Sequence, residues 1–255
     1  MLLYLIRHAQ SANNDLYART GSSDGRSADP PLTELGHRQA ELLAHYLATS
    51  REGPGNASPI LDEFAARHNR RGFDLTHLYC SLMTRAIQTG SYIATATGLP
   101  ITGWVEVHER GGVHHLDEIS GEDIGLPGPN RAWFAAEYPH LILPDRLGDA
   151  GWWNRPPETI TEALDRANTV WLQLLERHGG TEDRVAIVSH LGFFQSLLTV
   201  MLATESGQAV RSFGLSRIMF GMSNVSISRF ELDGESFVVR YLNRVDFLPE
   251  ELITG

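Results

Sequence analysis

Hydrophobic positions along this chain follow two alternating patterns. Short apolar runs are typical of buried strands, and longer segments with apolar residues every three or four positions are typical of amphipathic helices. The predicted strands are residues 2–6, 75–80, 185–189, 225–232 and 237–242. One predicted helix begins after Thr33, and a second runs from about residue 84 to 97. Two more cover the periodic segments 160–175 and 193–201. This alternation predicts an α/β fold of three α/β/α layers around a mostly parallel sheet.

Two segments interrupt this alternation. Residues 51–72 contain Pro54, Gly55, Asn56 and Pro59, and we interpret them as a surface insertion. Residues 104–158 carry six prolines and little periodicity. Long irregular segments within a domain are commonly lids or binding loops. We therefore predict a single domain over residues 1–255, with a lid insertion at about 104–158 that contains one or two short helices, the clearest near Arg131 to Tyr138.

Composition restricts the classes of protein that fit. Apolar residues make up 42% of the chain and charged residues 20%, the balance of a water-soluble globular protein. The single cysteine, Cys80, cannot form an intramolecular disulfide, which favours a cytoplasmic location. No apolar stretch has the length of a membrane span. A net charge of −10 argues against a nucleic-acid surface, so any anion would bind in a local basic pocket.

Basic side chains follow three of the predicted strands. Arg7 and His8 come directly after the first strand, Arg85 lies in the helix after the second, and His190 follows the strand at 185–189. Ligands of parallel sheets bind beyond the carboxyl ends of the strands. Two arginines and two histidines from distant parts of the chain should therefore meet at one edge of the sheet. This arrangement predicts an anion site.

Four sequence blocks resemble the histidine phosphatase superfamily, which has the phosphoglycerate-mutase-like fold. The opening block has Ala9 where glycine is usual and otherwise matches through Arg7, His8, Gln10, Ser11 and Asn14. The blocks DPPLTELGHRQA, SLMTRAIQTG and VSHLGFF follow in the family's order. Together the blocks cover residues 1 to about 243, and four in order are far more specific than any one alone.

The resemblance implies a role for each matching residue. His8 would be the nucleophile that becomes phosphorylated, and the phosphoryl group would be bound by Arg7, Asn14, Arg85 and His190, the last also catalytic. Fixed cationic donors suit a transferring phosphoryl group, whose charge spreads over three oxygens. The two guanidinium groups should also lower the pKa of His8 and leave one ring nitrogen free to attack.

The resemblance also implies a carboxyl group that exchanges protons with the leaving oxygen and the attacking water. Glu109, in the sequence VHERGG, is the match. Glu106 is the competing candidate. Three more carboxyl groups stay open if the loop folds differently, and they are Asp117, Glu118 and Glu122.

The resemblance leaves a choice between phosphatase and mutase. Mutases of the family usually carry a Gly-Trp pair before the second block and Asn-Ser-Leu-Arg after the second histidine, whereas this chain has residues TGSS at 20–23 and LGFF at 191–194. These departures favour water as the acceptor. We predict a metal-independent phosphatase that hydrolyses a phosphate monoester through a phosphohistidine intermediate. The alternatives are phosphoglycerate-mutase-type transfer and a catalytically silent phosphoryl-binding protein.

The remaining predictions concern ligands and partners. In the lid, His115, Arg131 and Arg155 are the polar candidates for substrate contact. The cluster His108, His114, His115 and Asp117 matches no strong zinc signature, so we predict no metal and no other cofactor. The expected partner is a small phosphate monoester or inorganic phosphate, with no nucleic acid and no membrane. An exposed edge strand or lid face could support a homodimer.

Overall fold

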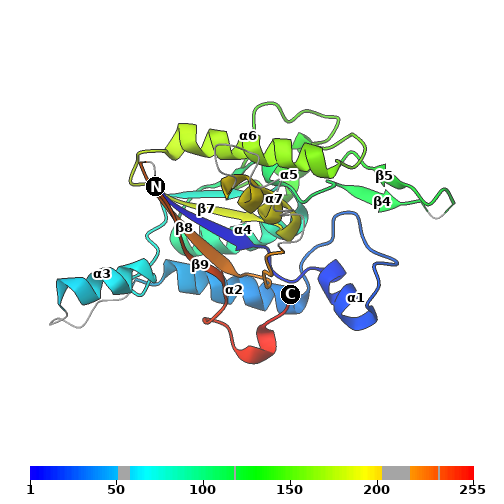
Figure 1. Ribbon diagram of the computed structural model, residues 1–255. Helices are drawn as coiled ribbons and strands as arrows, with labels where there is room; N and C mark the ends of the chain where they lie inside the picture. The colour runs from blue at the N-terminus through cyan, green and yellow to red at the C-terminus, as the bar shows by residue number, and fades with distance from the viewer. Residues whose placement is uncertain (51–57, 118, 203–218, 235) are drawn as a thin grey trace.

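A seven-stranded sheet runs through the middle of the molecule and has helices on both faces (Figure 1). The computed structural model describes residues 1–50, 58–117, 119–202, 219–234 and 236–255. The strand order is β6-β3-β2-β7-β1-β8-β9. The strands are β1 (Leu2–Arg7), β2 (His77–Cys80), β3 (Ile101–Gly103), β6 (Leu141–Ile142), β7 (Arg184–Ser189), β8 (Ile227–Asp233) and β9 (Ser236–Arg244).

The sheet is mostly parallel. Pairing is parallel from β6 through β3, β2 and β7 to β1, and antiparallel from β1 to β8 and from β8 to β9. A separate hairpin joins β4 (His114–Leu116) to β5 (Asp123–Gly125). The predicted α/β class with a mostly parallel central sheet is confirmed.

Four helices cover the sheet, α2 (Glu34–Ala48) and α4 (Thr84–Thr97) on one face and α6 (Ile160–His178) and α7 (Leu191–Met201) on the other. The other helices are α1 (Ala12–Thr20), α3 (Pro59–Arg67) and α5 (Arg131–Glu137), with 3-10 turns η1 (Val105–Val107) and η3 (Glu250–Leu252). Local sequence fixes several of their ends. Thr33 accepts a hydrogen bond from Gly36 N and begins α2, and Gly98, at φ 73°, ends α4.

Two apolar cores separate the layers. Tyr4 and Ile6 of β1 pack with α2 and α4 on one face, and Leu3 and Leu5 pack with α6 and α7 on the other. Alternation along an extended strand explains this division, because successive side chains point to opposite faces. β1 is thus buried on both sides, and the packing of both faces fixes the position of its carboxyl end.

The structure also contains elements that hydrophobic patterning did not indicate. Residues 12–20, for which the sequence predicted no element, form α1, which buries none of its side chains. The short strands β3 and β6 were not predicted either. The predicted insertion at 51–72 contains α3, while residues 51–57 lie outside the described part of the chain. The helix expected near Arg131 is present as α5. None of the helices in the described ranges has both the length and the apolar character of a membrane span.

Candidate active site

The carboxyl ends of β1, β2 and β7 bring the predicted basic residues together. In the parallel register Arg7 of β1 lies beside Ser189 of β7, and His8 N donates to the Ser189 carbonyl at 2.9 Å. The chain after β2 is joined in the same way, since Ser81 N donates to the Val188 carbonyl. The rings of His8 and His190 lie 5.0 Å apart between centroids. The site predicted at this edge of the sheet therefore assembles.

The partners of His8 assign its tautomer. The ring is 3% exposed, and its Nδ1 atom lies 2.7 Å from the Ala9 carbonyl, which can only accept. Its Nε2 atom lies 3.2 Å from Arg85 Nε, which can only donate. Nδ1 therefore carries the hydrogen and Nε2 presents its lone pair. A neutral imidazole of this tautomer can act as a nucleophile through Nε2.

Burial and charge keep His8 neutral. Burial lowers the pKa of His8 well below its ordinary value, and the Arg85 and Arg7 guanidinium groups lower it further. Burial also lowers the pKa of Arg7 to about 10, an effect that nearby Glu109 opposes. At neutral pH the site thus has two cationic arginines around an uncharged imidazole.

His190 and Arg7 each retain a hydrogen-bonding atom that is buried and has no partner among the described residues. His190 Nε2 lies 2.9 Å from Ser81 Oγ, whereas its Nδ1 is unpartnered. Arg7 donates through Nη1 to the Met222 carbonyl, whereas its Nε is unpartnered. A buried polar atom without a partner is costly. Both atoms can bind an anion placed beside His8.

Glu109 lies against the first turn of α7. Its Oε1 accepts from Phe193 N at 3.1 Å and from Arg110 N at 2.7 Å, and its Oε2 accepts from Gly192 N at 3.3 Å. Backbone N–H groups at a helix N-terminus favour an anion. These N–H groups hold the half-buried carboxylate against the residues that follow His190 in the chain.

The competing carboxyl groups lie elsewhere. Glu106 is paired with Arg146 and lines a separate cavity of about 350 Å³ with Tyr79 and Trp104. Asp117 accepts from backbone N–H groups of its own turn, at Ile119 and Ser120. Glu122 is exposed, and Glu118 lies outside the described residues. Glu109 is therefore the candidate that the geometry favours.

Asn14 contributes to the site through a neighbour that sequence reasoning missed. Its Oδ1 accepts from Ser11 N, from Ser11 Oγ and from Asn224 Nδ2 at 3.3 Å. The fully buried Asn224 also donates to the His8 carbonyl at 3.0 Å. The two amides thus hold the backbone of the nucleophile's turn. Asn224 does not follow the carboxyl end of any of the parallel strands, so no local signal in the sequence indicated it.

Asp29 is a second residue that the sequence did not reveal. Its carboxylate accepts from Thr84 N and Thr84 Oγ1 at the start of α4, and lies 3.7 Å from Arg85 Nη1. It therefore caps the helix that carries Arg85 and opposes the charge of that arginine. A carboxylate from a distant loop does not appear in a local capping pattern.

The three predicted lid residues lie in different surroundings. Arg131 donates to the carbonyls of Leu147, Pro144 and Asp145, so its guanidinium holds its own loop together. Arg155 is exposed and stacks over the Trp153 ring at 4.3 Å. His115 lies on β4 with a buried Nδ1 that has no partner in the described chain. Substrate contact by these residues stays a prediction.

His108, considered as a metal ligand, has a packing role. Its ring centroid lies 5.6 Å from that of Trp152 and 4.7 Å from that of Trp153. Its Nδ1 donates to the Glu109 carbonyl at 2.7 Å. Within the described ranges, the potential ligand atoms of His108, His114, His115 and Asp117 do not come together as a group.

Known proteins share the sequence pattern and the fold of this chain. The model of the histidine phosphatase superfamily (branch 1) matches residues 3–60 and 62–245. No curated protein matches the sequence. The fold is similar to mycobacterial glucosyl-3-phosphoglycerate phosphatase, with a TM-score of 0.54 at 21% identity over 96% of this chain and 99% of that one.

Two further solved structures come from Entamoeba histolytica. A phosphoserine phosphatase mutant in complex with phosphoserine has a TM-score of 0.53 at 16% identity, over 97% of this chain and 99% of that one. The same phosphatase in complex with 3-phosphoglyceric acid has a TM-score of 0.53 at 17% identity, with the same coverage. At these identities the similarity shows the fold.

Proposed function

The chain belongs to branch 1 of the histidine phosphatase superfamily, and from that premise we propose that it is a metal-independent phosphatase acting through phosphohistidine. The substrate is a phosphate monoester. The observation that carries the proposal is the lone pair of His8 Nε2, which faces Arg85 in a buried and positively charged site. A nucleophile kept neutral beside two arginines is suited to attack an anionic phosphoryl group.

In the first step, His8 Nε2 forms a bond to phosphorus while the bond from phosphorus to the ester oxygen breaks. Arg85 turns its Nε–H from the His8 lone pair to a phosphoryl oxygen, and the other phosphoryl oxygens interact with Arg7 Nε and His190 Nδ1. These last two buried atoms have no partner among the described residues. These donors neutralise the charge that spreads over the oxygens. The ester oxygen takes a proton from the Glu109 carboxyl and leaves as an alcohol.

In the second step, water replaces the imidazole on phosphorus. Glu109 removes a proton from the water as its oxygen attacks, and the electron pair of the P–N bond returns to His8 Nε2. The carboxyl thus regains the proton that it gave to the leaving group, and inorganic phosphate is released. Gly192 N and Phe193 N orient the carboxylate for both transfers.

Water is the proposed acceptor because of the residues that follow His190. The first turn of α7 consists of Leu191, Gly192, Phe193 and Phe194, and Phe193 and Phe194 are fully buried. This turn therefore provides no side-chain hydrogen-bond donor for a second phosphoryl group. Several solved neighbours are phosphatases by name, including complexes with vanadate and with inorganic phosphate, which supports the same choice.

The test compares turnover of aryl and alkyl phosphate monoesters in the presence of a chelator. His8→Ala should abolish turnover and the acid-labile phosphoenzyme seen by mass spectrometry. Glu109→Gln should slow alkyl esters by about 10² to 10⁴-fold and affect a nitrophenyl ester less in the first step, because that leaving group needs no proton. Glu106→Gln serves as the matched control and should change little.

Two outcomes would contradict the proposal. Unchanged turnover in His8→Ala would exclude the phosphohistidine mechanism. A native protein that hydrolyses no ester would instead favour mutase-type transfer or a silent phosphoryl-binding protein, and a phosphohistidine formed from a doubly phosphorylated donor would distinguish these two.

A further inference from the structure

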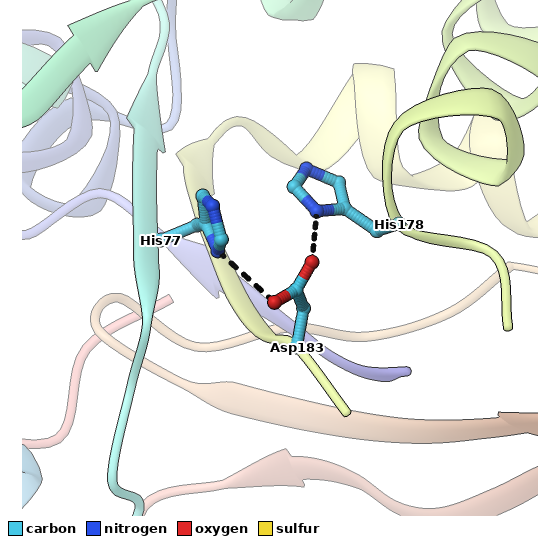
Figure 2. A group of neighbouring side chains, drawn as sticks. All are labelled: His77, His178 and Asp183. Atoms are coloured by element: carbon cyan, nitrogen blue, oxygen red, sulfur yellow. Dashed lines mark hydrogen bonds and ion pairs between the residues drawn. The ribbon is translucent and has the colours of Figure 1, made fainter. Parts of the chain in front are cut away.

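Two histidines and an aspartate meet at the edge of the sheet opposite the proposed phosphoryl site (Figure 2). His77 is the first residue of β2, His178 is the last residue of α6, and Asp183 directly precedes β7. His77 and Asp183 lie at the amino-terminal ends of parallel strands, and the end of α6 brings His178 beside them. The residues of the phosphoryl site follow the carboxyl ends, so the two clusters are separate.

The geometry of the cluster is close to that of a metal site. Figure 2 shows the two carboxylate oxygens of Asp183 facing the two imidazole rings, with Oδ2 at 2.8 Å from His178 Nδ1 and Oδ1 at 3.8 Å from His77 Nδ1. One potential ligand atom from each residue lies within 4.8 Å of the others. Donors around a tetrahedral zinc ion, with bonds of about 2.0 to 2.1 Å, are separated by roughly 3.4 Å. Side-chain shifts of about an ångström would place all three around one ion.

We propose that His77, His178 and Asp183 bind one divalent transition-metal ion of the zinc class, with water as the fourth ligand. Two imidazoles and a carboxylate are a donor set that suits Zn²⁺ and also Co²⁺ or Ni²⁺. Mg²⁺ and Ca²⁺ prefer oxygen donors and should bind weakly.

Tyr79 supplies the outer contact that such a site needs. Its hydroxyl lies 3.1 Å from His178 Nε2, on the side of the ring away from Asp183. When the ion replaces the hydrogen on Nδ1, the neutral ring carries its hydrogen on Nε2 and donates it to the tyrosine oxygen. A hydrogen bond from the ring nitrogen that does not bind the metal orients a metal-bound imidazole and increases its basicity.

His77 can also offer the lone pair of its Nδ1 atom to an ion. Its Nδ1 lies 2.8 Å from Thr76 Oγ1, and that hydroxyl also lies 3.4 Å from the Arg184 carbonyl. A hydroxyl has one hydrogen, so it can turn from the imidazole to the carbonyl without losing a partner. The His77 and Asp183 side chains are 41% and 27% exposed, which gives an ion access from solvent, whereas His178 is 4% exposed and fixed.

The site would join three elements that are distant in sequence. An ion bound by these side chains links the end of α6 to the starts of β2 and β7. Because ligand binding to the folded state alone stabilises it, such an ion should raise the melting temperature. Turnover at the opposite edge of the sheet does not involve this ion.

The test uses the full chain, treated with chelator and then dialysed. Calorimetric titration with Zn²⁺ should show one ion per chain, with a rise in Tm that Mg²⁺ does not produce. His77→Ala and Asp183→Asn should each weaken zinc binding by about 100-fold, and Tyr79→Phe by about 10-fold, as expected for an outer partner. Co²⁺ should give the absorption bands of a four-coordinate nitrogen and oxygen site in the native chain and not in His77→Ala or Asp183→Asn.

Two control variants separate this site from others. His68→Ala removes an exposed imidazole elsewhere and should leave zinc affinity unchanged. His8→Asn should also retain zinc binding, and a loss there would place the ion in the phosphoryl site and overturn the proposal. Equal affinity in the native chain, His77→Ala and Asp183→Asn would overturn it too, as would a native chain that binds no zinc. The Tm of each metal-free variant shows whether it folds normally.

Discussion

Arg85 donates its Nε–H to the Nε2 atom of His8 across 3.2 Å. The His8 ring also donates from Nδ1 to the Ala9 carbonyl. The histidine is therefore held as the one neutral tautomer that can attack through Nε2. One arginine thus fixes the nucleophile before substrate binds, and its remaining donors can then bind the phosphoryl oxygens. The Arg85 Nε–H must turn from the His8 lone pair to a phosphoryl oxygen when Nε2 attacks phosphorus, because one lone pair cannot serve both.

Arg85→Lys should lower kcat/KM by roughly 100-fold or more, because lysine keeps the charge but loses the planar fork that addresses His8 and the phosphoryl oxygens together. Steady-state kinetics on an aryl phosphate would measure this. A variant with native turnover and native Tm would show that only the positive charge at this position matters.

Asp29→Asn should lower turnover by roughly 10-fold, because the orientation of Arg85 loosens without its anionic partner. Burial raises the pKa of Asp29, and Arg85 opposes that effect. The amide oxygen of asparagine can still accept from Thr84, so stability should change little. Asp29→Ala also removes this cap and should cost about 1 kcal/mol of unfolding free energy. Urea denaturation of both variants separates the two effects, and equal loss of turnover and stability in both would contradict a role in orienting Arg85.

Stability should decrease as pH falls below about 6.5, the ordinary histidine value. Burial is the main cause that lowers the pKa values of His8, His108 and His190 well below that value. Between the folded and unfolded pKa values, the unfolded chain binds more protons, so stability rises with pH and is lost on acidification. Each histidine contributes up to about 1.4 kcal/mol per pH unit.

Urea midpoints measured at several pH values between neutral and mildly acidic would check this dependence. Inorganic phosphate should partly reverse the loss, since an anion in the site favours protonated imidazole. A flat profile over this range would contradict the buried, neutral state of the three rings.

Sequence patterning predicted the long elements that bury an apolar face and missed short strands and elements without a buried face. β3 and β6, of three and two residues, were missed although Ile101 and Leu141 are buried in the core. The helix from residue 84 to 97 was predicted with its observed bounds, because its apolar periodicity and the Gly98 end signal agree. α1 buries no side chain and is held by the capping pair Ser11 and Asn14, so hydrophobic periodicity could not indicate it. The β4–β5 hairpin similarly has two exposed apolar residues and no buried face.

The candidate site was predictable where its residues follow strand ends. His8, Arg7 and His190 occupy positions that the topology of a parallel sheet brings together. Asp29 and Asn224 reach the site from loops far along the chain, and only tertiary packing places them there. Arg131 was a reasonable lid candidate by its charge, but the carbonyls of its own loop occupy its guanidinium.

Gly192→Ala tests the position of Glu109 without touching a reacting group. A Cβ at residue 192 would lie 2.3 Å from Glu109 Oε1, so the carboxylate or the first turn of α7 must shift. Gly192 is the second residue of α7, where alanine favours the helix less than in its interior, so this gain and the cost of the shift should leave Tm little changed. Turnover of alkyl esters should fall by about 100-fold, because a displacement of an ångström is enough to disrupt proton transfer. Gly148→Ala, where an added Cβ meets no atom of the described residues within 4 Å, is the matched control. Full activity in Gly192→Ala would mean that proton transfer does not depend on the observed position of Glu109.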